Sequence, residues 1–595
     1  MNLEISSLLT AYRNHTRTPR EVISTLQIAI EKAPSTIWIS KSTPQQLESY
    51  LKNLEGKSPD DLPLYGIPFA IKDNIDCKGF KSTAACPAYA YTPQKSAFVV
   101  NRLIELGAIP MGKTNMDQFA TGLVGVRSPY GTIPNKFAPE YISGGSSSGS
   151  AAALAYHLCS FSLGTDTAGS GRVPAAFNHL VGVKPTRGIL SANGVIPACK
   201  SLDCVSIFAL NHHDARTLLN LATKEDFDDA YSRCAPWNLP NGKAERLNEN
   251  WTFGVPEESE LNFFGNDSYK KAFEKTVKAF ENAGGKKVVI HFTPFLEAAR
   301  LLYEGPWVFE RYAAVGKFIE EHPSEIYPVT KEIICPKKTP HPSSVFDGFH
   351  ALQEKKKIAD LEFSKVDVLL TPTAGTIYKT EEVLKNPIQL NSNLGYYTNY
   401  MNLLDYSALA IPAGFVNLND EKKSRIPFGV TLVGRAFDDF KLLDVADKVK
   451  SYLMQDENDC DEKIQIAVCG AHLKGEPLHF QLQNAEFICA TKTASEYKMF
   501  AFEDKGIKKP ALIYAKSLGE NEKGNSFYVE IYAMTANDFS KFIQQISSPL
   551  SIGKLKLENG ENILGFVGDT QILDSAQFKN ALDISEFGDW RKFKK

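Results

Sequence analysis

Between Glu140 and Gly188 the chain has the sequence EYISGGSSSGSAAALAYHLCSFSLGTDTAGSGRVPAAFNHLVGVKPTRG, in which serines and glycines gather between apolar segments. A flexible linker explains the glycines, but it does not explain ordered apolar segments on both sides. The part SAAALAYHLCSFSLGTD predicts a helix followed by a strand. We therefore interpret the serine-rich run and the TDTAGSGR segment as two loops, whose glycines let them approach each other closely.

Strand and helix patterns alternate on both sides of this region. GIPFAIKDNID (66–76) predicts a short apolar strand that ends in polar residues, and VDVLLTPTAG (366–375) predicts a buried strand. IPFGVTLVGRAFDDFKLLDVADKVKSYL (426–453) predicts a strand, a turn and a closing helix. Strands separated by helices in this way predict an α/β domain with a mixed, largely parallel sheet covered by helices on both faces.

The composition changes near residue 454. MQDENDCDEK (454–463) is polar and acid-rich, which is typical of a linker. Beyond it, short β segments follow one another, interrupted by one amphipathic helix, TANDFSKFIQQI (535–546). We predict an α/β domain over 1–453, a linker over 454–463 and a smaller β-rich α+β domain over 464–595.

Charge and cysteine usage exclude several classes of protein. The formal net charge of -3 gives no electrostatic reason for binding nucleic acid or an anionic membrane, and no long apolar run is present to span a bilayer. The N-terminus lacks the pattern of a secretory signal. The ten cysteines are scattered without C-x-x-C pairs, which predicts reduced thiols in a cytoplasmic protein with no structural metal. No cofactor is predicted.

The residues offer one route to nucleophilic catalysis. No G-x-S-x-G elbow is evident, and no triad context surrounds the histidines of the first domain, which are His157, His179, His212, His213 and His291. A neutral lysine can activate a serine through a second hydroxyl, provided that burial lowers its pKa. Lys72 lies at the polar end of a predicted strand and suits this role. A lysine there can also be simply solvated, and the strand pattern alone favours that simpler interpretation.

Four segments in order resemble the amidase signature family. GGSSSGSAAA is followed 24 positions after Ser146 by Ser170 of GTDTAGSGRVPA, and GIPFAIKDNID, GKTNMDQFA and VGVKPTRG match the family's other landmarks. The resemblance covers most of residues 20–450. It implies a Ser-Ser-Lys relay, in which Ser170 is the nucleophile, Ser146 the bridging hydroxyl and Lys72 the base. It also implies a cis peptide bond entering Ser146.

The loop that carries the implied nucleophile has further features. Thr167, Ala168, Gly169 and Ser170 offer successive backbone N–H groups for an oxyanion hole. We expect Asp166 and Arg172, which flank this segment, to brace the loop rather than to react. Ser147 and Ser148, which follow Ser146, are expected to hold the serine-rich loop through hydroxyl–backbone hydrogen bonds.

A second region indicates the substrate. Tyr303 and Arg311 are eight residues apart, which on one helix is about two turns and nearly one face. Spacing alone favours the simpler interpretation of a surface arginine on an amphipathic helix. However, YEGPWVFERYAAV (303–315) and FATGLVGVRSPYG (119–131) resemble allophanate hydrolases. That resemblance implies that Tyr303 and Arg311 hold the substrate carboxylate, and that Gly122 lines the small pocket.

The tail resembles the C-terminal domain of allophanate hydrolases, through AVCGAHLKGEPLHFQL, TKTASEYKMFAF and VEIYAMTANDFSKFI in order. The family then implies hydrolysis of allophanate to ammonia and N-carboxycarbamate in urea degradation. It further implies a functional link to a urea carboxylase, a homodimer, and a C-terminal domain that assists decarboxylation on a fold similar to gamma-glutamyl cyclotransferases. The alternatives are an amidase of this family acting on another small carboxylated amide, and an inactive binding module.

His472 is the candidate catalytic residue of the second domain, because an imidazole delivers protons near neutral pH. It can equally be a histidine that only hydrogen-bonds a loop. The family commonly has PLN where this chain has Pro477-Leu478-His479, which is a departure close to the candidate. Glu530 could be a catalytic carboxylate or a buried structural one, and we favour the structural role.

Overall fold

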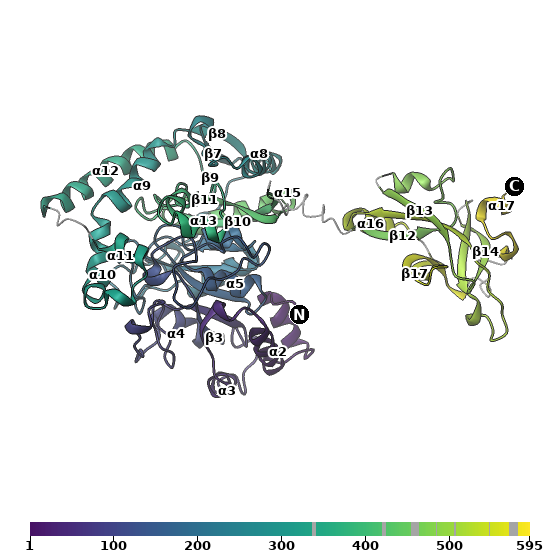
Figure 1. Ribbon diagram of the computed structural model, residues 1–595, viewed down its shortest axis with the longest axis horizontal. Coiled ribbons are helices and arrows are strands. Elements are labelled where there is room, and N and C mark those ends of the chain that lie inside the picture. The colour runs from purple at the N-terminus through teal and green to yellow at the C-terminus, as the bar shows by residue number, and fades with distance from the viewer. Residues whose placement is uncertain are drawn as a thin grey trace. The chain divides into compact units, whose positions relative to one another are not determined.

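The computed structural model describes residues 1–335, 341–418, 420, 424–453, 463–483, 485–504, 507–546, 548–570 and 581–594. The chain divides into two compact units, Met1–Met454 and Gln455–Lys595 (Figure 1). Each unit encloses a separate hydrophobic core. Residues 454–462, which make up most of the predicted linker, lie outside the described residues.

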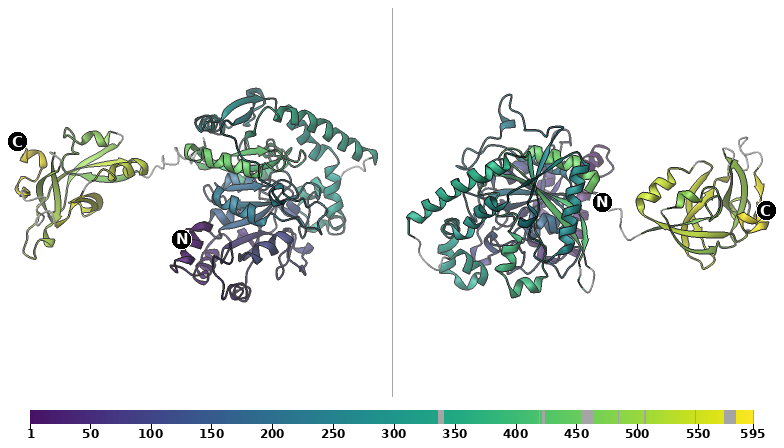
Figure 2. Two further views of the ribbon diagram at one scale, coloured as in Figure 1. Left: turned by 180° about the vertical axis from the view of Figure 1, so that it is seen from behind. Right: turned by 90° about the horizontal axis from the view of Figure 1, so that it is seen from above.

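The first unit is built on one 11-stranded sheet. Across the sheet the strands are β1 (Trp38–Lys41), β3 (Ile109–Thr114), β2 (Pro68–Lys72), β4 (Phe161–Asp166), β6 (Cys204–Ala209), β5 (Val181–Lys184), β10 (Ser407–Asn417), β11 (Arg425–Gly434), β9 (Val368–Pro372), β7 (Thr252–Pro256) and β8 (Lys286–Ile290). Helices cover the faces of the twisted sheet (Figure 2). The α/β architecture expected from the alternating patterns is therefore confirmed.

The helices of this unit are α1 (Ile5–Arg13), α2 (Pro19–Lys32), α3 (Pro44–Lys52), α4 (Phe98–Glu105), α5 (Ser148–Ala155), α6 (Val173–Phe177), α7 (His212–Ala222), α8 (Asp267–Asn282), α9 (Thr293–Glu304), α10 (Trp307–Glu321), α11 (Pro328–Ile334), α12 (Ser343–Phe363), α13 (Thr380–Lys385), α14 (Gln389–Leu394) and α15 (Asp439–Leu453). Of these, α5 packs on β2, β3 and β4. None of the helices among the described residues is both long and apolar enough to cross a bilayer.

The sheet is mixed, as expected, but the expectation that parallel pairs predominate is wrong. Among the described strand pairs of this 11-stranded sheet, only β2–β3, β2–β4, β7–β8 and β7–β9 are parallel. The centre is antiparallel, from β4 through β6, β5, β10 and β11 to β9. The connection between β10 and β11 is too short for a crossover, so these two long strands can only pair antiparallel.

The second unit is β-rich with one well-formed helix, as predicted. A five-stranded sheet has the order β13 (Glu486–Lys492), β16 (Tyr528–Met534), β12 (Ile464–Val468), β18 (Asn562–Gly568) and β17 (Leu550–Lys556), and a three-stranded sheet has the order β15 (Ile507–Tyr514), β14 (Tyr497–Asp504) and β19 (Leu582–Asp583). Helix α16 (Ala536–Ile543) begins at Thr535, whose hydroxyl caps it, and α17 (Trp590–Phe593) follows β19. The likeness of this unit to gamma-glutamyl cyclotransferases stays a prediction.

Candidate active site

Three side chains from separate segments form a hydrogen-bonded row in the first unit. Lys72 Nζ lies 2.8 Å from Ser146 Oγ, and Ser146 Oγ lies 3.0 Å from Ser170 Oγ. All three residues are buried, and the lysine has no exposed surface. The structure therefore brings together the lysine and both serines in the order that a proton relay requires.

Parallel pairing of β2 and β4 places the two ends of this row. Phe69 pairs with Phe161 and Ile71 with Leu163, so the carboxyl ends of both strands reach the same edge of the sheet. Lys72 is the last residue of β2, while β4 continues directly into the loop that carries Ser170. The bridging serine comes from a third segment, just before α5.

The surroundings of Lys72 favour its uncharged form. Burial lowers its pKa from the ordinary value to about 7, although the carboxylates of Asp117, Asp166 and Asp203 favour the cation and oppose the shift. Because only an uncharged amine can accept a proton, the fraction of Lys72 competent as a base grows as the pH rises through that value. An ordinary lysine stays charged well above neutral pH.

Glycines let the loops meet where side chains would collide. The peptide bond between Gly145 and Ser146 is cis, as the family resemblance implied. A Cβ on Gly145 would fall on the Asp117 carboxylate and lie 2.6 Å from the Gly125 nitrogen. Gly169, at a φ of 134°, lies against Thr398, whose hydroxyl would be 2.5 Å from a Cβ there.

The loop that carries Ser170 is braced as expected. Arg172 donates to Asp166 through Nε and Nη2, both at 2.9 Å, and neither side chain is exposed. Ser147 Oγ donates to the Thr165 carbonyl at 3.1 Å, which ties the serine-rich loop to the end of β4. These contacts hold both serine-bearing segments against one strand end.

One member of the expected oxyanion hole is engaged elsewhere. The Gly169 N–H donates to Asp166 Oδ1 at 2.8 Å. This N–H group is therefore not available to bind an oxyanion, contrary to the expectation from the sequence. The N–H groups of Thr167, Ala168 and Ser170 remain as proposed donors. The Thr167 hydroxyl donates to Asp203 Oδ1 at 2.5 Å, which fixes the other side of this loop.

Tyr303 and Arg311 meet, but they do so from two helices rather than one. Helix α9 ends at Glu304 and α10 begins at Trp307, because Pro306 cannot continue a helix. The expectation of a single helical face is therefore wrong. The two side chains nevertheless contact each other, with Arg311 Cζ 5.6 Å from the centre of the Tyr303 ring.

Arg311 is a buried cation with unused donors. It is 3% exposed, and its Nε and Nη1 atoms are buried without a hydrogen-bond partner. Leaving buried, charged donors unpaired is costly, and an anionic ligand would remove that cost. The alternative of a solvated surface arginine does not hold.

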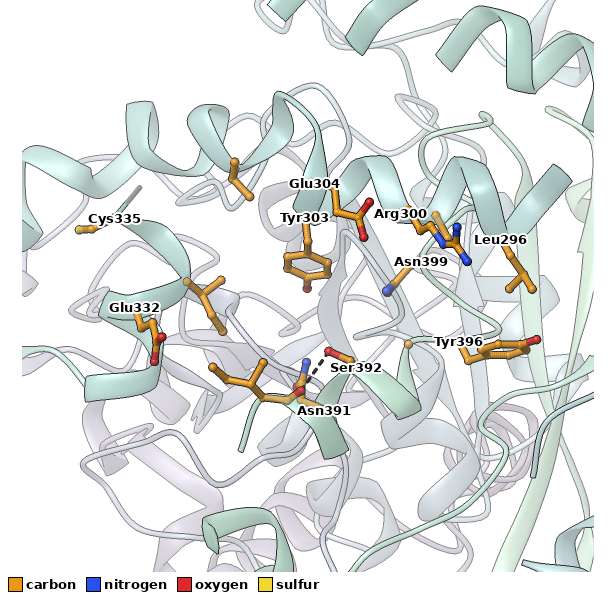
Figure 3. Close-up of a pocket in the computed structure, with 15 residues that line it drawn as sticks. Leu296, Arg300, Tyr303, Glu304, Glu332, Cys335, Asn391, Ser392, Tyr396 and Asn399 are labelled. Carbon is orange, nitrogen blue, oxygen red and sulfur yellow. Dashed lines mark hydrogen bonds between the residues drawn. The ribbon is translucent and has the colours of Figure 1, made fainter. Parts of the chain in front are cut away.

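Tyr303 also lines a cavity of about 640 Å³ (Figure 3). Figure 3 shows the tyrosine pointing from α9 into the space beside Ser392 and Asn391. The cavity wall is hydrogen-bonded to the segment that follows Gly122, since Asn391 Oδ1 accepts the Leu123 N–H at 2.7 Å. The neighbouring residue, Gly122, places its carbonyl 3.5 Å from Ser170 Oγ.

In the second unit, His472 is half-buried. Its ring stacks on Phe566, and its Nε2 lies 2.8 Å from Gln481 Oε1. Burial lowers the pKa of His472, so the neutral form predominates near pH 7. Glu530 accepts the Lys474 N–H and the Tyr532 hydroxyl, each at 2.9 Å, which supports the structural role favoured for it.

Three residues of this site were not identified from the sequence. Thr165 Oγ1 lies 2.7 Å from Lys72 Nζ, and Asp203 accepts the Thr167 hydroxyl. Asp117 accepts backbone N–H groups from the loop that contains Gly122. Asp117 and Thr165 lie within motifs that resemble the amidase signature. Their place in these motifs was the only feature of the sequence that could have indicated a role in the site.

Comparison with known proteins agrees with this arrangement. The family model "Amidase" matches residues 21–443, and the model "Allophanate hydrolase C-terminal domain" matches residues 464–595. The chain belongs to the amidase family. In this amidase the second unit is an allophanate hydrolase C-terminal domain, and the fusion of the two expected from the sequence is confirmed.

Individual relatives give the same result. A urea amidolyase of Lachancea kluyveri is 39% identical over 97% of this chain, and one of Saccharomyces cerevisiae is 39% identical over 93%. The chain spans only 32% and 31% of those two proteins. The crystal structure of Kluyveromyces lactis allophanate hydrolase is 38% identical, with a TM-score of 0.71 over 99% of this amidase and 98% of that chain.

Proposed function

We propose that this amidase is an allophanate hydrolase that uses Lys72, Ser146 and Ser170 as its proton relay. The observation that carries the proposal is the row of hydrogen bonds from a buried lysine through one serine to another, in a unit that also contains a buried arginine with two unpaired nitrogens. The match in both units to allophanate hydrolase supports it.

Allophanate is H2N–CO–NH–COO⁻, and attack would fall on its terminal carbonyl carbon. Ser170 Oγ forms a bond to that carbon while its proton passes to Ser146, whose own proton passes to Lys72. The carbon–nitrogen bond then breaks, and the departing nitrogen takes a proton back through the relay and leaves as ammonia. Water, activated by the same relay, hydrolyses the acyl-enzyme and releases N-carboxycarbamate.

Binding of the substrate carboxylate, at the end away from the reacting carbonyl, would distinguish allophanate from other amides. Arg311 presents a planar fork with two buried, unpaired nitrogens, and Tyr303 lies against it. A carboxylate bound there would fix the register of a very small substrate relative to Ser170, with Gly122 beside it. Another small carboxylated amide would meet the same requirement, and this is the second candidate function.

The C-terminal unit is proposed to assist decarboxylation of N-carboxycarbamate, with His472 as the residue that transfers a proton. We also propose a functional link to a urea carboxylase in urea degradation, a homodimer and a cytoplasmic location. The long urea amidolyases, of which this chain matches about a third, support the link to urea.

The first prediction concerns the nucleophile. Ser170→Ala removes the oxygen that attacks the substrate, and we expect it to lower ammonia release from allophanate by at least about a thousandfold. The matched control is Ser268→Ala, since Ser268 is a half-buried serine of α8 whose hydroxyl donates to the Asn417 carbonyl. Full ammonia release by the Ser170 variant would exclude it as nucleophile.

The second prediction concerns the carboxylate. Arg311→Lys keeps the charge but loses the fork, so the ratio of kcat/KM for allophanate to that for biuret, its neutral amide analogue, should fall about tenfold or more. Arg216→Lys, on α7 with its ion pairs to Asp444 and Asp447, serves as control. An unchanged ratio contradicts this role of Arg311.

The third prediction concerns the second unit. When carbon-13-labelled allophanate is followed by NMR, His472→Asn is expected to accumulate N-carboxycarbamate while the first ammonia is released at the normal rate. Clearance of the intermediate at the normal rate would show that His472 only holds its loop.

A further inference from the structure

Asp117 is a buried carboxylate at the junction of the loops that carry the relay. It follows β3 and has no exposed surface. Its Oδ2 accepts the N–H groups of Val124 at 3.3 Å and Gly125 at 3.0 Å, and its Oδ1 accepts that of Arg127 at 2.9 Å. One carboxylate therefore fixes the whole turn that follows Gly122.

The same residue also holds the bridging serine. Its backbone N–H donates to the Ser146 carbonyl at 3.1 Å. Its Oδ2 atom occupies the space where a Cβ on Gly145 would lie, and it would be 2.7 Å from a Cβ on Gly122. Because the Gly122 carbonyl lies 3.5 Å from Ser170 Oγ, Asp117 sets the position of groups that contact both serines.

The Asp117 carboxylate has different hydrogen-bond partners from the other two carboxylates that act on Lys72. Asp166 is held by both arms of the Arg172 fork. Asp203 accepts the Thr167 hydroxyl, and burial raises its pKa to about 6, so this carboxylate begins to lose its charge as the pH falls toward 6. The carboxylate bonds of Asp117 described above come from backbone N–H groups.

The cation Arg127 interacts electrostatically with Asp117, but its guanidinium hydrogen bonds go to other groups. The guanidinium of Arg127 donates to the carbonyls of Thr121 and Pro387. Lys113 is 3.6 Å from Asp73 in a fully buried ion pair. Among the carboxylates that act on Lys72, Asp117 has the largest effect.

We propose that Asp117 is a positioning residue of the relay: it locks the Gly122 turn against the Ser146 segment, and its negative charge stabilises Lys72 after the lysine has taken the proton. The proposal rests on the relay given under Proposed function. It assigns to one side chain both the geometry of the two serines and the charge balance of the base.

The test measures how fast a fluorophosphonate labels Ser170 of the full-length protein, by mass spectrometry, across the pH range of the Lys72 titration. This readout needs no assumption about the natural substrate. Asp117→Asn removes the charge, so the acidic limb of the labelling rate should move about half a pH unit or more toward acid, with a lower plateau. Asp117→Glu keeps a charge, and its limb should stay near the wild-type position although its plateau falls.

The control is Asp214→Asn, because Asp214 is another buried carboxylate that joins two segments, through the Ile5 N–H, and it is remote in sequence from the relay. This variant should leave limb and plateau unchanged. If Asp117→Asn does not fold, Asp117→Ser, smaller and also neutral, is measured instead.

A limb that stays at the wild-type position in Asp117→Asn or Asp117→Ser would overturn the charge role. An unchanged plateau in those variants would overturn the geometric role. Absence of labelling at Ser170 in the wild type would overturn the relay and this inference together. Normal labelling without allophanate hydrolysis would instead refute the proposed substrate and leave the role of Asp117 supported.

Discussion

The structure of this amidase depends on keeping one amine uncharged inside the protein. Lys72 has no exposed surface, and the two closest oxygens around its Nζ belong to the hydroxyls of Ser146 and Thr165. Hydroxyls stabilise an ammonium less well than water or a paired carboxylate does, so burial favours the neutral form. The parallel pairing of β2 and β4, the glycines of both loops and the Asp166–Arg172 pair all serve to hold two serines beside that amine.

The proposed substrate-binding pair, Tyr303 and Arg311, instead keeps a charged group buried. Arg311 remains charged, and its unpaired nitrogens are buried next to Tyr303. A carboxylate bound there would gain a charge-assisted bidentate contact that a neutral amide cannot make. A neutral base at one end and a cation at the other fit a small amide with a single acidic end.

Much of the site could be predicted from sequence because its residues occupy short, ordered motifs. Lys72, Ser146 and Ser170 lie within such motifs, and the structure places them in hydrogen-bond contact. Tyr303 and Arg311 also proved adjacent, although Pro306 divides them between two helices. Individual hydrogen bonds could not be predicted from the motifs. The backbone N–H groups that Asp117 accepts, and the hydrogen bond from the Gly169 N–H to Asp166, were therefore missed. The antiparallel centre of the sheet was missed as well, because local periodicity does not specify which strands pair.

The most direct test of the central claim is the titration of the Lys72 amine itself. Carbon-13 NMR of lysine-labelled protein, with the signal assigned by its loss in Lys72→Met, reports the charge of this side chain at each pH. We predict that the Lys72 amine titrates with a midpoint at about pH 7. A lysine that stays protonated up to its ordinary pKa of about 10.4 would contradict it, because such a cation could not take the proton of a serine at neutral pH.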